Sequence, residues 1–271
     1  MKRRRRAIIL LTLTLFASVP VAAIAGPPFQ TDDPEPVPYR HWEIYIVETY
    51  AHAGTGISGS LPIVEVNYGV VPNVQLSIVA PVSYVQSAGN GFRAGYGDTE
   101  IGIKLRFIQE TRARPQVAVY PIAILPTRNA RSGLGEGTVR TLLPLWLQKS
   151  WGAWTTYAGV GRWHNPGVGN RDWWYTGWTV EHENASGVVV GSEVFHATSD
   201  RVDRAGATGF AVGLIAPIRG RTNLLLSVGR SLRGDNSVSV YGAYEIKFGP
   251  EPDTRLRAEQ TPKHNGTLRP S

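Results

Sequence analysis

Apolar and polar residues alternate with a period of two over most of this chain. In residues 64–84, VEVNYGVVPNVQLSIVAPVSY, every second residue from Val64 to the turn is apolar, and the residues between them, beginning with Glu65, are mostly polar or glycine. This is the period of a β-strand with one apolar and one polar face. The alternation stops at the turn pair Pro72 and Asn73 and then resumes. The stretch therefore predicts a β-hairpin, and similar units make up most of the chain.

The same pattern predicts a series of twelve β-strands. Each is about ten residues long, the length of a tilted strand that crosses a membrane. Glycine, proline and other turn-forming residues separate the runs. The predicted strands are 42–53, 62–71, 74–85, 98–108, 116–126, 139–149, 153–163, 173–183, 187–198, 207–218, 222–232 and 237–248.

Long and short connectors alternate between these strands. The long set is 54–61, 86–97, 127–138, 164–172 and 199–206, and the short set is 72–73, 150–152, 184–186 and 219–221. Two connectors, 109–115 and 233–236, fit this alternation less well. A soluble β-sandwich or propeller has no reason to alternate in this way, whereas an outer-membrane barrel has short periplasmic turns and longer external loops. The sequence thus predicts an all-β, antiparallel, up-and-down transmembrane barrel over 42–248, with both ends in the periplasm.

The polar face of each predicted strand supplies the candidates for the barrel interior. In strand 98–108, Ile101 and Ile103 would face lipid, while the charged residues between them would face the lumen. The candidates selected in this way are Glu65, Glu100, Lys104, Arg106, Glu181, Glu183, Glu193, Glu245 and Lys247. Two interpretations remain open: these residues line a solute path, or they pair with one another and plug a narrow barrel.

Aromatic residues gather near the ends of the predicted strands, where girdles at the two membrane interfaces would place them. Next to the short connectors these are Trp42, Tyr68, Trp151, Trp154 and Phe248, and next to the long connectors they are Tyr50, Tyr84, Trp163, Trp173 and Trp174. Strands 116–126 and 139–149 contain Pro121 and Pro144 and alternate poorly, so their lipid-facing side is not predicted.

Residues 1–25 have the pattern of a secretory signal peptide. Lys2 and four arginines precede an apolar run over 7–21, and a small-residue site ends at Ala25. We expect export and cleavage after Ala25. A retained membrane helix is the alternative, but the run is short for a span and contains Pro20.

The leader also explains most of the basic charge. It carries five Lys and Arg residues and no acid, so it accounts for five of the seven net positive charges and leaves +2 on the mature chain. This balance does not support a nucleic-acid partner. The chain has no cysteine, which excludes disulfides and cysteine-ligated metal sites.

The segments that flank the predicted barrel are polar and rich in proline. Residues 26–41, GPPFQTDDPEPVPYRH, hold five prolines, which exclude a continuous helix or central strand. We expect this segment to be an extended periplasmic lead-in and 249–271 to be a polar periplasmic tail. Asp32 and Asp33 lack the spacing of an EF-hand calcium loop, and a solvated or capping acidic turn explains them better. No metal or cofactor is predicted.

An enzyme is a third interpretation, because some outer-membrane barrels hydrolyse lipids with a Ser and His pair. The candidates would be His182 and His196, with Ser186 and Ser199 nearby and Glu193 as an orienting acid. Barrel lipases and deacylases tend to show His followed two residues later by Ser and then by Asn, and neither histidine here has that Ser. We therefore expect no catalysis.

Four stretches resemble one known family. The lead-in FQTDDPEPVPYRHWEIYI, the hairpin TNLLLSVGRSL, and the middle segments GSEVFHATSD and TGFAVGLIAPI are similar to bacterial outer-membrane proteins grouped as transporters and named after a meta-pathway of phenol degradation. The similarity extends over most of the mature chain. It implies an outer-membrane β-barrel with a role in the uptake of small compounds, aromatic or hydrophobic ones among them, and it supplies no residue-level mechanism.

The sequence therefore predicts an exported outer-membrane barrel that passes small molecules. A non-conducting barrel, with a structural role or a binding surface on its loops, is the alternative. The expected partners are outer-membrane lipid and lipopolysaccharide, the barrel assembly machinery and a small-molecule solute.

Overall fold

The computed structural model describes residues 27–87, 91–128, 133–234 and 236–250, and every regular element in them is a β-strand. No helix among the described residues is long and apolar enough to cross a membrane. The strands are β1 (Trp42–Ala53), β2 (Gly56–Val71), β3 (Val74–Ser87), β4 (Gly91–Tyr96), β5 (Thr99–Ile108), β6 (Gln116–Val119), β7 (Ile122–Leu125), β8 (Arg140–Trp151), β9 (Trp154–His164), β10 (Trp173–Glu183), β11 (Val189–Ala197), β12 (Ala207–Arg219), β13 (Thr222–Arg233) and β14 (Val238–Phe248).

Two pairs of these strands are halves of a single barrel strand. Both β4 and β5 pair with β3, one after the other, and the break between them falls at residues 97–98. Likewise β6 and β7 both pair with β5 and with β8, and the break falls at Tyr120 and Pro121. Proline has no N–H to donate, so a break in the ladder at Pro121 follows from its chemistry.

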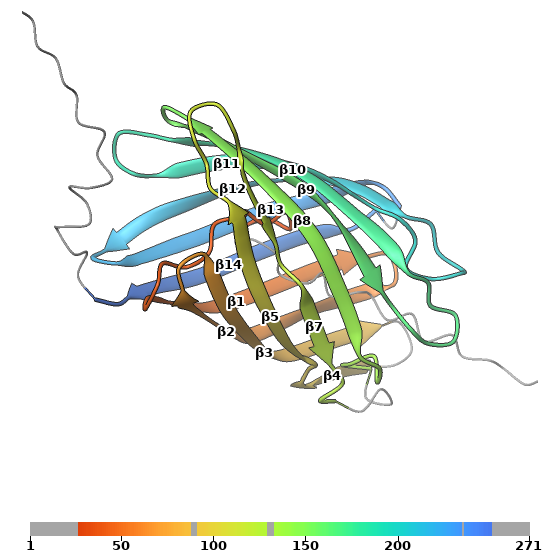
Figure 1. The fold of residues 1–271 in the computed structure, drawn as a ribbon. Helices are drawn as coiled ribbons and strands as arrows, with labels where there is room; N and C mark the ends of the chain where they lie inside the picture. Colours follow the sequence, from red (N-terminus) through yellow and green to blue (C-terminus); the bar gives the residue numbers. More distant parts are fainter. Residues whose placement is uncertain (1–26, 88–90, 129–132, 235, 251–271) are drawn as a thin grey trace, which may run out of the picture.

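The sheet closes on itself because β1 pairs with β14. The predicted twelve-stranded antiparallel barrel is therefore confirmed, and Figure 1 shows the strands curving around one interior. Closure leaves every strand a neighbour on each side over most of its length, which a membrane-spanning sheet requires.

Two predicted long connectors are wrong. Residues 86–97 were expected to form one of them, but β4 occupies Gly91–Tyr96 and pairs with β3. Residues 54–61 were expected to form a long loop, but β2 already begins at Gly56 and pairs with the end of β1 and with β3. Ladder hydrogen bonds need only the backbone, so a strand can continue past its apolar stretch. The extended hairpin has a β-bulge at Leu61 and Pro62, where two residues of β2 face one residue on each neighbouring strand.

The two faces of the barrel differ in the way that the alternation predicted. On β5, Ile101, Ile103 and Leu105 are exposed on the outer face, whereas Glu100 and Lys104 between them are buried inside.

On β8 both faces are apolar, with Leu143, Leu145 and Leu147 outside and Leu142 and Trp146 inside. This is why the alternation in that strand is weak.

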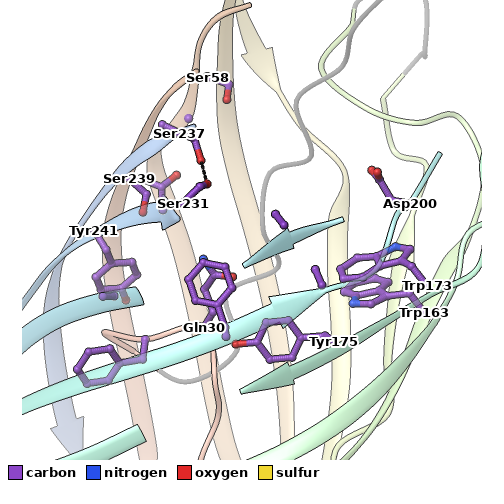
Figure 2. A pocket seen from close by; sticks show the side chains of 18 of the residues that line it. Gln30, Ser58, Trp163, Trp173, Tyr175, Asp200, Ser231, Ser237, Ser239 and Tyr241 are labelled. Atoms are coloured by element: carbon purple, nitrogen blue, oxygen red, sulfur yellow. Dashed lines mark hydrogen bonds between the residues drawn. The ribbon is translucent and has the colours of Figure 1, made fainter. Parts of the chain in front are cut away.

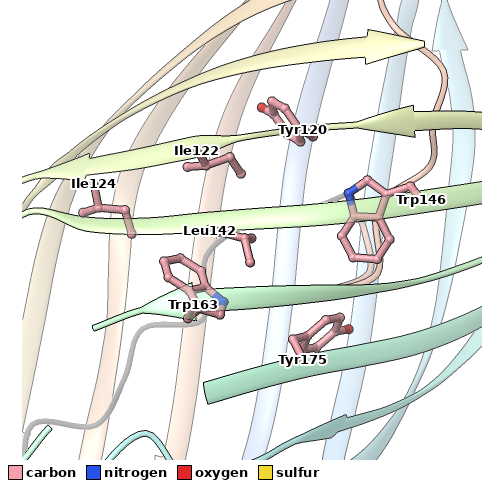
Figure 3. Packing of buried hydrophobic residues seen from close by; sticks show 7 residues of the cluster. All are labelled: Tyr120, Ile122, Ile124, Leu142, Trp146, Trp163 and Tyr175. Atoms are coloured by element: carbon pink, nitrogen blue, oxygen red, sulfur yellow. The ribbon is translucent and has the colours of Figure 1, made fainter. Parts of the chain in front are cut away.

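Part of the interior is a packed apolar wall. Figure 3 shows its members converging from β7, β8, β9, β10 and the break before β7. They are Tyr120, Ile122, Ile124, Leu142, Trp146, Trp163 and Tyr175. The sequence did not predict the lipid-facing side of strands 116–126 and 139–149, and the structure shows that large apolar side chains of these strands point inward and fill part of the interior.

The segment before β1 is not outside the barrel. Residues 27–41 are extended, as expected, but Phe29, Thr31 and Asp32 are buried and contact side chains of the barrel interior. The periplasmic lead-in predicted at 26–41 therefore needs correction: polar groups inside a narrow barrel need partners, and this segment supplies them. The signal peptide and its cleavage after Ala25, and the tail from residue 251 onward, lie outside the described residues.

Candidate functional site

Residues 28–37, called the plug below, lie inside the barrel and contact its inner wall at several points. The N–H of Val37 donates to Oε1 of Gln75 at 2.8 Å, and the hydroxyl of Ser227 donates to the carbonyl of Pro28 at 2.6 Å. Phe29 packs with Tyr157 and Ala211 in a small buried cluster. The proline-rich sequence suits this role, because it stays extended without a strand partner.

Glu193 on β11 is the first anchor of the plug. Its carboxylate accepts hydrogen bonds from the N–H of Gln30 at 3.2 Å, from the N–H and the hydroxyl of Thr31 at 2.5 Å each, and from the hydroxyl of Tyr175 at 3.0 Å. The residue is 1% exposed. Four donors around one buried carboxylate supply the hydrogen bonds that such a charge needs.

Lys104 on β5 is the second anchor. Its ammonium group lies 3.0 Å from Oδ1 of Asp32 and donates to the carbonyl of Asp33 at 2.9 Å. Both Lys104 and Asp32 are buried. A buried pair of this kind holds its two segments together, since removal of either partner leaves a charge without compensation.

Arg106 forms a looser contact with the same segment, at 3.8 Å from Glu35. It also donates to Oδ1 of Asn73 and to Oε1 of Gln116.

Most of the other predicted interior residues lie on the inner face of the barrel, whereas Glu183 does not join them. Glu245 accepts from Tyr45 at 2.7 Å and pairs with Lys247 at 3.0 Å. Glu181 accepts from Tyr157 at 2.9 Å.

Glu65 accepts from Asn67 at 2.8 Å, and Glu100 is buried nearby on the inner face. Glu183, in contrast, is exposed at the end of β10, next to the turn, and the structure does not bring it together with the other candidates.

The sequence identified the barrel side of these contacts but missed the plug side. Thr31 and its wall partner Tyr175 were not selected, Asp32 was interpreted only as part of an acidic turn, and Glu35 was given no role. One signal could have found the acids: TDDPEP carries negative charges, and Lys104 and Arg106 lie on a predicted inner face. The pairing itself depends on the chain turning back into the barrel, which no local pattern predicts.

A cavity of about 250 Å³ lies next to the plug, toward the connectors 165–172 and 198–206. Figure 2 shows aromatic side chains on one wall and a group of serines on the other. The aromatic wall includes Trp163, Trp173 and Tyr175, and the plug contributes Phe29 and Gln30. The volume lies just below the usual range of small-molecule pockets.

Two tryptophans in this wall correct the predicted girdle. Trp163 is buried on the inner face of β9 and stacks on Trp173 with ring centroids 5.2 Å apart. By contrast, Trp174, the next residue on β10, is exposed on the outer face. The near-parallel pair therefore belongs to the cavity, whereas Trp174 fits the expected girdle.

The connectors beside the cavity are held by polar contacts. Asn170 bridges to Arg201 in a short antiparallel pairing. Asp172 accepts from the N–H of Asn165 and pairs with Arg162 at 3.0 Å. The N–H of Asn165, followed by the neighbouring His164, lowers the pKa of the Asp172 carboxyl below its usual range.

The residues considered for lipid hydrolysis do not form a catalytic group. His196 shares a hydrogen bond with Thr208 on the outer face, and Ser199 donates to the carbonyls of Arg201 and Arg204. His182 packs against Trp154, and Ser186 donates to Asn184. Glu193 is occupied with the plug. The described residues also contain no group of three or more His, Asp or Glu side chains that could hold a metal ion.

Comparison with protein-family models gives no match, and comparison with curated proteins gives none either. Among solved structures, the COG4313 outer membrane channel from Pseudomonas putida F1 is similar, with a TM-score of 0.68 at 16% identity over 80% of this chain and 98% of that one. The NanC porin gives a TM-score of 0.55 at 9% identity over 76% and 100%. The KdgM porin in complex with oligogalacturonate gives 0.50 at 7% identity over 75% and 99%. At these identities the likeness shows the fold, which is that of outer-membrane channel and porin barrels.

Proposed function

We propose that this protein is an outer-membrane channel for small molecules with apolar or aromatic character, and that the plug closes it. The observation that carries the proposal is the cavity between the plug and the outer connectors, which has an aromatic wall on one side, hydroxyl groups on the other, and charged residues such as Arg140, Asp200 and Arg201 in its lining. Aromatic walls favour flat apolar solutes, and a few polar groups orient them. The porin-like fold of the barrel supports a passage rather than a purely structural role.

Passage requires the plug to move. Residues 28–37 fill the interior beside the cavity through polar contacts to Glu193 and Lys104 and the apolar contact of Phe29. Polar contacts can be replaced by water or by a solute when the segment leaves, whereas the backbone ladder of the barrel stays intact. We therefore assign closure to the plug and the permanent wall to the strands.

The location follows the same proposal. The chain is exported with the help of residues 1–25, loses them after Ala25, and is inserted by the barrel assembly machinery. The short turns then face the periplasm, as in outer-membrane barrels generally.

A disulfide between plug and wall tests this function. A Cβ added at Gly177 on β10 would lie 3.1 Å from the Cβ of Thr31, shorter than the roughly 3.5–4.5 Å found in disulfides, so the plug must shift by a few tenths of an ångström to accept the bond. The Tyr175 hydroxyl, 2.7 Å from the same Cβ, must move as well. The chain has no cysteine of its own, so the double variant Thr31→Cys with Gly177→Cys would form a single defined bond. We expect uptake of a small aromatic probe such as phenol, into vesicles that contain the refolded barrel, to fall severalfold when the bond forms and to recover on reduction.

The two single-cysteine variants are the controls, because they carry the same side-chain changes without the bond. If the oxidised double variant admits the probe as fast as the reduced one, the plug is not the closing element. If neither form admits any probe and neither conducts ions, the barrel is non-conducting, and the packed charge network of its interior serves the structure alone.

A further inference from the structure

A belt of mostly polar side chains, three of them arginines, lies on the outer face of the barrel, at the end that carries the long connectors. Arg162 on β9 points outward, since its neighbour Trp163 is buried inside and its own side chain is 59% exposed. Arg230 on β13 is exposed between Gly229 and Ser231, which are both buried. Arg233 follows on the same outer face after a bulge, and it is exposed too.

The strand register connects these arginines through further polar residues. Arg162 pairs with Trp174, and Thr176 on the same strand pairs with His196. His196 pairs with Thr208, and Thr208 pairs with Arg233. The belt therefore runs without interruption from β9 to β13 and is defined by Arg162, Trp174, Thr176, His196, Thr208, Arg230 and Arg233.

The belt lies directly beside the apolar surface of the barrel. Two residues further along each strand, toward the middle of the barrel, Val160 follows Arg162, Val194 follows His196 and Phe210 follows Thr208. All three are exposed on the outer face. Arg162 also lies over the ring of Trp174, at 5.9 Å from its centroid. A row of cations and one aromatic ring next to an apolar band is suited to a molecule with anionic groups above acyl chains.

The opposite edge of the barrel has a different character. Its outward residues include Trp42, Trp151 and Trp154, all exposed. Cations are present on this edge too: Lys149 pairs with Glu110 at 2.6 Å, much as Arg162 pairs with Asp172 at 3.0 Å, and Arg112, Arg114 and Arg219 are exposed. What distinguishes the two edges is therefore the three outward tryptophans on one and, on the other, outward arginines directly beside the apolar surface.

We propose that this belt is a binding site for lipopolysaccharide, whose lipid A phosphates contact Arg162, Arg230 and Arg233 while its acyl chains cover the apolar surface below. Arginine forks match phosphate oxygens in a bidentate manner, and His196 and Thr208 add donors between them. The inference rests on the proposed membrane placement of the barrel and not on conduction through it. It also orients the barrel, since it assigns the long connectors to the leaflet that holds lipopolysaccharide.

Titration of the detergent-solubilised full-length barrel with purified lipid A tests this site. The triple variant Arg162→Gln, Arg230→Gln, Arg233→Gln should bind lipid A at least tenfold more weakly than the wild type, because three cations near an anionic surface are removed. Conversion of the same three arginines to lysine keeps the charge but removes the forks, so it should bind more tightly than the glutamine variant and more weakly than the wild type. The matched control is Lys149→Gln with Arg219→Gln, two cations from the opposite end of the strands, which should bind as the wild type does.

Equal lipid A affinity of the triple glutamine variant and the wild type would overturn the proposal. So would equal binding of phosphatidylcholine, because that result would mean that the apolar band alone selects the lipid. Heat-modifiable mobility on gels confirms that each variant is a folded barrel. Loss of that mobility in the wild type would refute the membrane placement itself, so the two failures are distinguishable.

Discussion

At the scale of single residues, Glu193 shows how many contacts of the plug depend on one carboxylate. It accepts from two backbone N–H groups of the plug, from Thr31 and from Tyr175, all in a nearly solvent-free position. The alternation in the sequence predicted that Glu193 faces the barrel interior, but its plug partners come from a segment more than 160 residues away.

Replacement of Glu193 by alanine should release the plug. The donors of Gln30 and Thr31 would be left buried without an acceptor, at a cost of about 1–3 kcal/mol each. A cost of this size raises the population with a displaced plug by at least about tenfold. We expect faster proteolysis within residues 27–41 and greater ion conductance, with the heat-modifiable mobility of the barrel retained.

Glu245→Ala is the matched control for that experiment. Glu245 is an equally buried inward carboxylate, but it bonds Tyr45, Asn223 and Lys247, all on the barrel wall. It should destabilise the barrel without changing the proteolysis of the plug. Similar proteolysis in both variants would contradict the anchoring role of Glu193.

At the scale of elements, apolar and polar residues alternate clearly along a strand when only one face is apolar. The alternation is weak when both faces are apolar. On β5 the alternation assigns the faces, since Lys104 is buried and Ile103 is exposed outside. On β8 leucines occupy the outer face while Leu142 and Trp146 belong to the interior wall, so the pattern alone could not assign them. Alternation therefore assigns the inner and outer faces most clearly in strands whose inward residues are charged.

A charge on the lipid face of β3 should test the assignment. Ile78 lies at the middle of that strand and is 48% exposed on the outer face. Ile78→Arg should lower the free energy of unfolding in lipid vesicles by about 2–4 kcal/mol, because the guanidinium would sit near the bilayer midplane. Denaturant titration of the vesicle-inserted barrel measures this difference.

Ile78→Leu serves as the control, since it keeps the position apolar and should change the stability by less than about 1.5 kcal/mol. If the arginine variant is as stable as the leucine variant, then this face of β3 does not contact lipid.

At the scale of the whole molecule, wall and plug are separable. The twelve barrel strands are joined by continuous ladders, from β1 through to β14 and back. The plug adds contacts with wall side chains such as Glu193 and Lys104, and the short parallel pairing of Tyr39 with Gly69 lies outside residues 28–37. The barrel should therefore close without it.

Deletion of residues 28–37 should leave a folded barrel that conducts more strongly than the wild type. The space vacated by Phe29, Thr31 and Asp32 would join the adjacent cavity and lengthen the open path. Single-channel recording in planar bilayers measures the conductance, and heat-modifiable mobility reports the fold. A folded deletion variant with unchanged conductance would assign the closure to the barrel wall instead.

The sequence by itself determined the strands, their number and the inner face of most of them, because these depend on local alternation and on turn residues. The tertiary structure alone decided the course of residues 28–37, the inward position of Trp163 and the partners of Lys104 and Glu193. A strand pattern records which side chains avoid lipid, but it does not record what fills the space they enclose. That space is filled by whichever distant segment satisfies the buried charges, and its identity emerges only when the barrel is closed.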